Sequence, residues 1–347
     1  MNQCGIEILF SFSGCAMTSR TCNSGWKEPE LEYTKVKYPH PLFDNRVSRD
    51  LGVPIPIVQA PMGWIARSQL ASAVSAAGAC GIIETSSGEL DAVKNEMAIM
   101  NGLGLPYGVN IAQAFVRDPD IAEFVINQGV KFVTTSAGSP TKYTGVLKAS
   151  GLTVYHVVPT LEAAKKAVDA GVDGLVVEGG EGGGFKSPTP VSTMVLLPLV
   201  RDHVSVPIIA AGGINDGRTM AAAFALGAEG VQMGTQMVSS EESPVHENWK
   251  RAIVDASETD TLFLNQKFSP ALRALRTDRS ERLSDSDSNV FGEFGNPQEL
   301  YFGGDMEAAI ALSGQVAGRI NEVRPIHDII SGTVNEFSET IARLKSQ

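Results

Sequence analysis

Eight short apolar runs recur along the chain, and no other feature of the sequence limits the fold as much. Their first residues lie roughly 20 to 35 positions apart, and segments of helical periodicity fill several gaps, a pattern typical of repeated strand–helix units. The runs are Pro54–Ala60, Cys80–Thr85, Tyr107–Ile111, Val130–Thr135, Thr153–Val158, Gly174–Glu178, Pro207–Ala211 and Gly230–Met233. The helical segments are Ser68–Ala77, Asp118–Asn127, Leu161–Ala170 and Gly217–Leu226.

Several of these runs are apolar at successive positions, as in Gly174–Val177 and Ile208–Ala211. A strand of this kind has both faces covered, which is typical of a parallel sheet with helices packed outside it. Eight strand–helix units close most simply into a (β/α)₈ TIM barrel, an α/β fold. An open doubly wound sheet is the alternative, but no Gly-x-Gly-x-x-Gly motif follows the first run, where a dinucleotide-binding fold would carry it.

The chain is predicted to divide into three parts. Residues 1–30 are expected to form an irregular extension, residues 31–260 the barrel, and residues 261–347 a lid-like insertion followed by C-terminal helices packed on the barrel. Within the third part, Arg276–Pro297 is rich in Ser, Asp, Arg and Gly, which indicates a lid or a surface loop. Helical spacing of apolar residues predicts helices near Ser243–Ala256, in Asp305–Glu322 and in Gly332–Leu344.

Composition excludes several classes of function. The 39 Asp and Glu residues outnumber the 28 Lys and Arg residues, for a net charge of −11, so nucleic-acid binding by bulk electrostatics is not expected. The apolar run Ile6–Met17 is too short for the ~20 residues of a membrane span. The four cysteines form no CxxC pair, so we expect no metal site and free thiols in a reducing cytoplasm. A small-molecule substrate is the expected partner, and a homodimer is left open.

Glycine is abundant, with 35 residues, and many glycines follow the apolar runs. In a barrel the ligand site lies at the carboxyl ends of the strands, and the last two loops commonly bind phosphate. The seventh run ends at Ala211 and is followed by Gly212 and Gly213. The eighth run is followed by Gly234 and Thr235. Since glycines let backbone N–H groups approach phosphate oxygens, the two loops together predict a phosphate site. A tight turn is the alternative for either loop alone.

A second glycine cluster begins where the sixth run ends. The segment Glu178–Phe185 carries five glycines, which are Gly179, Gly180, Gly182, Gly183 and Gly184. Such a stretch is costly in conformational entropy, which favours either a flat ligand lying against bare backbone or the hinge of a lid.

Other strand ends supply further groups at the predicted mouth of the barrel. Ala60, Pro61, Met62 and Gly63 stand at the end of the first run and offer main-chain amides and a polarizable thioether. Asn110, near the end of the third run, can both donate and accept hydrogen bonds, as the edge of a heterocyclic ring requires. Each of these residues taken singly is a weak signal.

The fifth run contains His156, one or two residues from the predicted mouth. Strand alternation places its side chain on the same face as those of Val154 and Val158. A lone histidine in a strand is commonly a core residue. Its position near the carboxyl end of the run also favours a catalytic role, so both interpretations are kept.

Taken together in this order, the motifs resemble the nitronate monooxygenase family, formerly called 2-nitropropane dioxygenases, and the related flavin-dependent enoyl-ACP reductases. The resemblance covers about residues 50–320 and implies a barrel that holds one FMN. It implies that the phosphate lies at Gly212, Gly213, Gly234 and Thr235. The ring would lie near Pro61, Met62, Asn110 and Glu178–Gly180. The motifs that carry it are Ala60–Gly63, Gly108–Asn110, Glu178–Gly184, Ala211–Ile214, Met233–Thr235, Ser269–Arg276, Gly304–Met306 and Ser313–Gly318.

One position departs from the family pattern. Many members close the glycine stretch with a histidine used as acid or base, whereas this chain has Phe185, which cannot transfer protons, followed by Lys186. Some relatives carry a further strand histidine 29 positions earlier, which corresponds to His156. His156 is therefore the catalytic candidate, with an ordinary pKa near ~6.5. Lys186 is a candidate for holding an anionic substrate, or else a solvated surface lysine.

The resemblance implies an FMN-dependent oxidoreductase that oxidises alkyl nitronates with O₂. The missing histidine keeps one enzymatic alternative open, an NAD(P)H-dependent reductase of an enoyl thioester or a quinone. A second alternative is a flavin-binding protein with little turnover, and a third is a phosphosugar-binding barrel without flavin.

Overall fold

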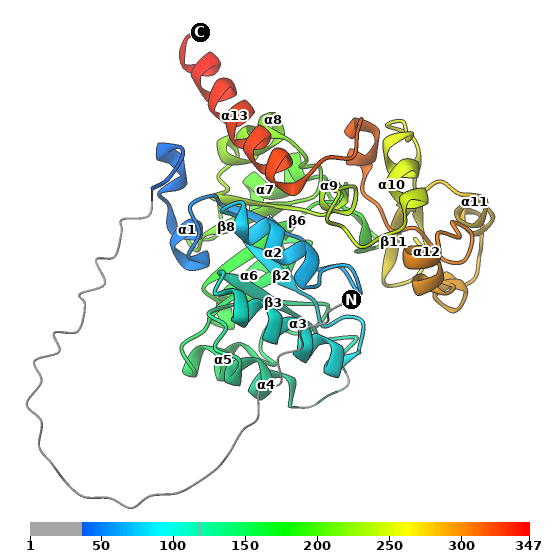
Figure 1. Ribbon diagram of the computed structural model, residues 1–347, viewed down its shortest axis with the longest axis horizontal. Helices are drawn as coiled ribbons and strands as arrows, with labels where there is room; N and C mark the ends of the chain where they lie inside the picture. The colour runs from blue at the N-terminus through cyan, green and yellow to red at the C-terminus, as the bar shows by residue number, and fades with distance from the viewer. Residues whose placement is uncertain (1–36, 117, 119) are drawn as a thin grey trace, which may run out of the picture. The chain divides into compact units, whose positions relative to one another are not determined.

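The computed structural model describes residues 37–116, 118 and 120–347, and its central element is a nearly closed barrel of eight parallel strands with helices outside (Figure 1). The strand order is β1-β9-β8-β6-β5-β4-β3-β2. A parallel bridge between Val58 and Cys80 joins β1, the first strand in this order, to the start of β2, the last. The barrel strands are β1 Ile57–Gln59, β2 Gly81–Ile83, β3 Tyr107–Ala112, β4 Phe132–Ser136, β5 Thr153–Val158, β6 Gly174–Glu178, β8 Ile208–Ala211 and β9 Gly230–Met233. The predicted TIM-barrel fold is confirmed, and each predicted run overlaps one of these strands.

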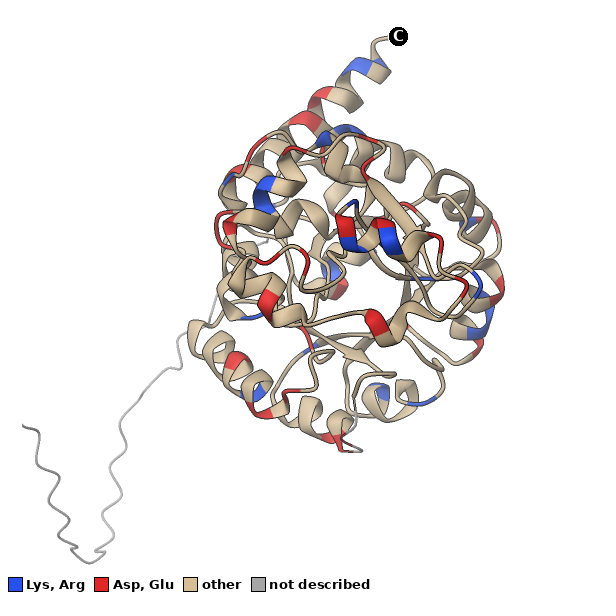
Figure 2. Ribbon diagram, turned by 90° about the vertical axis from the view of Figure 1, so that its right-hand side faces the viewer, with Lys and Arg blue, Asp and Glu red and all other residues tan. Residues whose placement is uncertain are grey.

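Helices follow most barrel strands, and the four helical segments predicted between the strands are found within a few residues of their expected ends. The α-helices are α1 Arg46–Leu51, α2 Ser68–Ala76, α3 Leu90–Leu103, α4 Ile121–Asn127, α5 Thr144–Ala149, α6 Leu161–Asp169, α7 Thr193–Arg201, α8 Gly217–Ala225, α9 Thr235–Val238, α10 Glu247–Val254, α11 Asp278–Ser284, α12 Pro297–Gly303 and α13 Ile326–Lys345. The 3₁₀ helices are η1 Pro41–Phe43, η2 Val290–Glu293 and η3 Gln315–Arg319. On the side seen in Figure 2, Lys and Arg are interspersed with Asp and Glu.

Local chemistry fixes where these helices begin and end. The Thr160 hydroxyl accepts the Ala163 N–H ahead of α6, and the Asp216 side chain caps α8 in a reciprocal capping box with Thr219. Gly104 ends α3 in the left-handed conformation, which costs glycine little. Within the described residues, no helix is both long enough and apolar enough to cross a bilayer.

Side chains of the barrel strands alternate between the barrel interior and the surrounding helices. On β5, Tyr155 packs in an interior cluster with Phe132 and Val176, whereas Val154 and Val158 pack in clusters on the helix side. This alternation decides which strand residues can face a ligand at the carboxyl end of the barrel.

A second sheet of three antiparallel strands lies outside the barrel and was not predicted. It has the order β10-β11-β7, with β7 Gly184–Lys186, β10 Thr261–Leu264 and β11 Ala271–Leu275. Its strand β7 lies within the glycine stretch and pairs with β11 in the C-terminal part of the chain. The glycine stretch is therefore bound to the segment after the barrel by a backbone ladder.

One prediction for the C-terminal part needs correction. Asp305–Glu322 is not helical except for η3, because part of its backbone bonds to other segments: the Ile310 N–H donates to the Phe294 carbonyl, and the Ala311 carbonyl accepts the Leu275 N–H. Arg276–Pro297 contains α11 and η2, and its role as a lid stays a prediction. The helix predicted at Gly332–Leu344 is confirmed as part of α13. The predictions for residues 1–30 and their cysteines lie outside the described residues, and the boundary at residue 260 stays a prediction.

Candidate functional site

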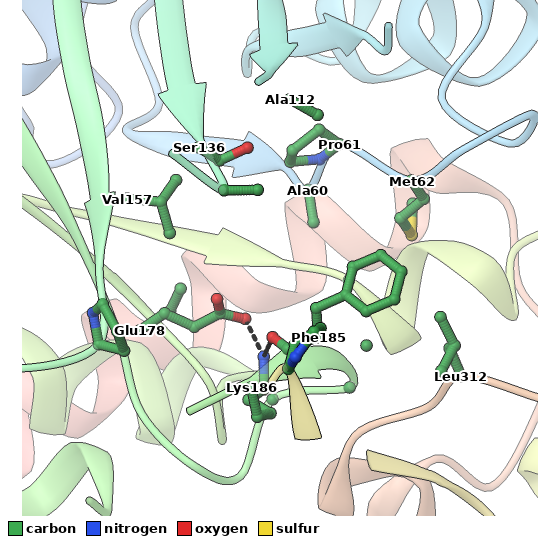
Figure 3. A pocket seen from close by; sticks show the side chains of 18 of the residues that line it. Ala60, Pro61, Met62, Ala112, Ser136, Val157, Glu178, Phe185, Lys186 and Leu312 are labelled. Atoms are coloured by element: carbon green, nitrogen blue, oxygen red, sulfur yellow. Dashed lines mark hydrogen bonds and ion pairs between the residues drawn. The ribbon is translucent and has the colours of Figure 1, made fainter. Parts of the chain in front are cut away.

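A cavity of about 1020 Å³ opens at the carboxyl ends of the barrel strands, as expected for this fold (Figure 3). Its walls include nearly all of the site residues predicted from sequence: Ala60, Pro61, Met62, Gly63, Asn110, His156, Glu178, Gly183, Gly184, Lys186, Ala211, Gly212, Gly213, Gly234 and Thr235. Two predicted residues do not line it. Gly179 packs so closely on Thr193 that a side chain would collide with its hydroxyl, and the Gly180 N–H binds the Val191 carbonyl.

Polar side chains from the inward positions of the strands form the floor of the cavity. Asn110 on β3 donates to the Thr134 hydroxyl at 2.9 Å, and Glu178 is the last residue of β6, at its carboxyl end. Sequence reasoning missed Gln232 on β9, which is buried and lines the cavity. Its position two residues before Gly234 on an inward-facing register was the only signal that could have indicated it.

The two glycine loops lie side by side because β8 and β9 are neighbours in the barrel. Gly212 and Gly213 both have positive φ, of 89° and 76°. Gly212 is required by packing, since a side chain there would lie 2.9 Å from the Gly179 carbonyl oxygen. By contrast, a side chain on Gly213 or Gly234 would meet nothing closer than 3.5 Å. The backbone at these two glycines is therefore open to the cavity.

Lys186 is buried in the cavity wall and is not a solvated surface lysine. Its side chain is 4% exposed, and its ammonium group forms an ion pair with the Glu178 carboxylate (Figure 3). The same ammonium donates to the Phe185 carbonyl at 3.3 Å. A lysine ammonium has three N–H donors, so one remains for a ligand.

The loop Ala60–Gly63 is held at the mouth by a buried ion pair that sequence reasoning also missed. The Glu84 carboxylate is fully buried, pairs with Arg67 at 3.0 Å and accepts the Trp64 backbone N–H at 3.2 Å. Trp64 itself has a positive φ of 61°, a strained conformation for a large residue. The ion pair and its hydrogen bonds offset that strain and fix the loop that carries Met62.

His156 lines the cavity and shares a face of β5 with Val154 and Val158, as strand alternation predicts; the structure shows that this face is the one toward the helices. Its Nδ1 is 2.7 Å from the Thr135 hydroxyl. Burial lowers the pKa of His156 to about 4, with a smaller opposing effect from the Gly138 backbone, so the expectation of an ordinary pKa is wrong. At neutral pH the imidazole is uncharged and can accept a proton, but its low pKa makes it a weak base. Its catalytic role stays a prediction.

The lowered pKa of His156 makes the stability of the protein depend on pH. Between pH 6.5 and about 4, His156 is protonated in the unfolded chain and neutral in the fold. The unfolded state then binds more protons, so stability falls as the pH is lowered, by up to about 3 kcal/mol. Urea unfolding at pH 7, 5.5 and 4.5 should show that His156→Gln loses less stability than the wild-type protein across this range. Equal losses would contradict the inference.

The residues present fit a flavin mononucleotide. The Gln232 Oε1 atom is buried without a hydrogen-bond partner, although the residue lines the cavity. A flavin ring carries an N–H group that can satisfy such an acceptor. The open backbone at Gly213 and Gly234 suits a phosphate, and no cluster of metal-ligating side chains occurs among the described residues.

Comparisons with known proteins agree with this geometry. The family model for nitronate monooxygenase matches residues 45–128 and 108–336. The structure of FabK from Thermotoga maritima is 38% identical and has a TM-score of 0.81, with 87% of this chain and 98% of that chain covered.

Two curated relatives carry different activities in their names. A (3aS,4S,5R,7aS)-5-hydroxy-7a-methyl-1-oxo-octahydro-1H-indene-4-carboxyl-CoA dehydrogenase from Mycobacterium tuberculosis is 35% identical over 67% of this chain, and the match spans 66% of that relative. A probable nitronate monooxygenase from Staphylococcus saprophyticus is 30% identical over 72% of this chain and 83% of the relative. The family match covers most of the chain, and the protein belongs to the nitronate monooxygenase family of flavin-dependent oxidoreductases.

Proposed function

We propose that the protein is an FMN-dependent oxidoreductase that oxidises alkyl nitronates with O₂. The observation that carries the proposal is the buried Lys186 ammonium, which lines the cavity with one N–H donor left over. When bound, the flavin supplies the redox chemistry. Its phosphate would be held at Gly212, Gly213, Gly234 and Thr235, and its ring near Pro61, Met62, Asn110 and Gln232.

Lys186 and Phe185 together suit a substrate that arrives already deprotonated. A nitronate is an anion whose negative charge lies on its two oxygens, and a lysine donor in a buried site binds such an oxygen strongly. No base is needed to remove a proton from it, so Phe185 in place of a histidine does not obstruct this reaction. Glu178 holds the ammonium in position, and the burial of the lysine side chain limits the access of water to it.

A second candidate is an NAD(P)H-dependent reductase of an enoyl thioester or a quinone. It is favoured by the similarity to FabK along 98% of that chain and by a relative whose name includes a CoA thioester. The cavity, at about 1020 Å³, is at the upper end of the ~300–1,000 Å³ typical of ligand sites, which leaves room for a large substrate beside a mononucleotide. Here Lys186 would donate to the carbonyl oxygen of the substrate.

Anaerobic stopped-flow reduction distinguishes the two candidates. We expect the flavin absorbance to bleach rapidly on mixing with ethyl nitronate, and only slowly with NADH or NADPH. Rapid bleaching by either nicotinamide alone would support the reductase instead. A coloured protein inert to all three reagents would indicate flavin binding with little turnover. Mass spectrometry of the released cofactor identifies it, and FAD or no flavin would contradict the assignment of FMN.

A further inference from the structure

Phe185 is the middle ring of an aromatic stack on the cavity wall. Its ring lies 4.9 Å from that of Phe115 at an interplanar angle of 23°, and 5.7 Å from that of Phe291 at 25°. The three residues come from the segment after β3, from β7 and from η2, so their approach is a product of the tertiary fold. All three line the cavity, and each is only partly buried.

The outer sheet supports this stack from behind. Phe185 and Phe291 pack against a buried apolar cluster that includes Leu264, Leu272 and Val290. Leu312 packs on the same cluster and also lines the cavity (Figure 3). The rings therefore stand on a packed base, and their remaining apolar surface faces the cavity.

An apolar surface of this kind binds a ligand through the area that it removes from water. Burial of each CH₂ group is worth about 0.8 kcal/mol, which corresponds to about a fourfold increase in affinity. Phe185 and Lys186 are successive residues of β7 and both line the cavity, so the same site offers a cationic donor and an apolar wall. A small nitroalkane anion would use the donor and leave most of the wall in contact with water.

We propose that Phe115, Phe185 and Phe291 bind the extended apolar carbon skeleton of the substrate, whose oxygen is held by Lys186. The proposal rests on the proposed function for the role of Lys186 and adds the substrate class to it. The substrate is thus a molecule with a polar oxygen at one end and a chain or ring system of many carbons at the other. Many family members have a histidine at the position of Phe185. In this chain the phenylalanine selects substrates that carry a large apolar group.

Binding of straight-chain carboxylates to the flavin-loaded protein tests this subsite without turnover. Acetate, butyrate, hexanoate and octanoate are titrated while the flavin absorbance is recorded. For the wild-type protein we expect the dissociation constant to fall about fourfold per CH₂ over the first several carbons. In Phe185→Asn the decrease should be less than about twofold per CH₂, whereas Phe185→Leu should keep most of it.

Phe294→Leu is the matched control, because Phe294 packs against Phe291 and the same cluster but does not line the cavity. It should leave the dependence on chain length unchanged. Flavin content and thermal unfolding establish that each variant is folded, and Phe115→Asn replaces Phe185→Asn if that variant does not fold. The proposal would be overturned if the wild-type affinity did not depend on chain length. It would also be overturned if neither Phe185→Asn nor Phe115→Asn reduced that dependence.

The failure of this subsite and the failure of the proposed function give different results. If nitronate oxidation is wrong, ethyl nitronate does not bleach the flavin, yet the dissociation constants of the carboxylates still fall with chain length. If the subsite is wrong, the series is flat while ethyl nitronate still reacts. If both hold, kcat/KM for the nitronate of 1-nitrooctane exceeds that for ethyl nitronate by at least tenfold, and Phe185→Asn removes most of that preference.

Discussion

Replacement of Gly213 with Asp is expected to leave the protein folded and nearly free of FMN. Gly213 has a φ of 76°, a region that Asp and Asn tolerate better than other side chains. A side chain there would meet only Glu181, at 3.6 Å, which is ordinary contact. The new carboxylate would lie where the phosphate is expected. Two like charges about 4 Å apart repel by about 4 kcal/mol at an effective dielectric constant of 20, so affinity should fall at least about a hundredfold.

Gly213→Asn is the matched control for this experiment. Asn has nearly the same shape as Asp and tolerates the same backbone conformation, but it carries no charge. The measurement is FMN bound per protein after purification, followed by titration of the flavin-free protein with FMN. We expect Gly213→Asn to weaken binding far less than Gly213→Asp. Normal occupancy in Gly213→Asp would place the phosphate elsewhere, and equal loss in both variants would indicate a steric effect of the side chain.

The barrel could be predicted from sequence because its strands are specified locally. Each buried parallel strand is a short apolar run, and its neighbours in space are its neighbours in sequence. The outer sheet lacks both signals. Its strand β7 is Gly184–Lys186, and its partner β11 lies more than 80 residues further along the chain. No local pattern indicates such a pairing, because the register is set by tertiary contacts.

Much of the site could be predicted for the same reason, since barrels place ligands at the carboxyl ends of strands. The glycines of the loops and the residues at the strand ends therefore predicted many of the residues that line the cavity. Burial of Lys186 could not be predicted, because it depends on the unforeseen strand β7 and on the ion pair with Glu178. The Arg67–Glu84 pair was missed because its two residues are 17 positions apart in chain segments that meet only in the fold. The low pKa of His156 similarly follows from burial that the sequence does not show.

Replacement of Lys186 with Met should nearly abolish the reaction with nitronates. Met keeps a long apolar side chain against the wall but removes the cation, and the Glu178 carboxylate is left in the cavity without its partner. Loss of a charged hydrogen bond to the substrate, together with repulsion by Glu178, should lower kcat/KM about 10²- to 10³-fold. The quantity to measure is the rate of anaerobic flavin reduction as a function of nitronate concentration.

A purely structural role for Lys186 would give a different pattern, and two comparisons separate the possibilities. Lys186→Arg keeps the positive charge and should retain part of the nitronate reaction, whereas Lys186→Gln should behave like Lys186→Met. Reoxidation of the chemically reduced flavin by a neutral quinone requires no anion site, so Lys186→Met should leave that rate within a few-fold of the wild-type value. If Lys186→Met slows both reactions equally, Lys186 does not select an anion: it either supports the fold of β7 or donates to the carbonyl oxygen of a neutral substrate, as in the second candidate.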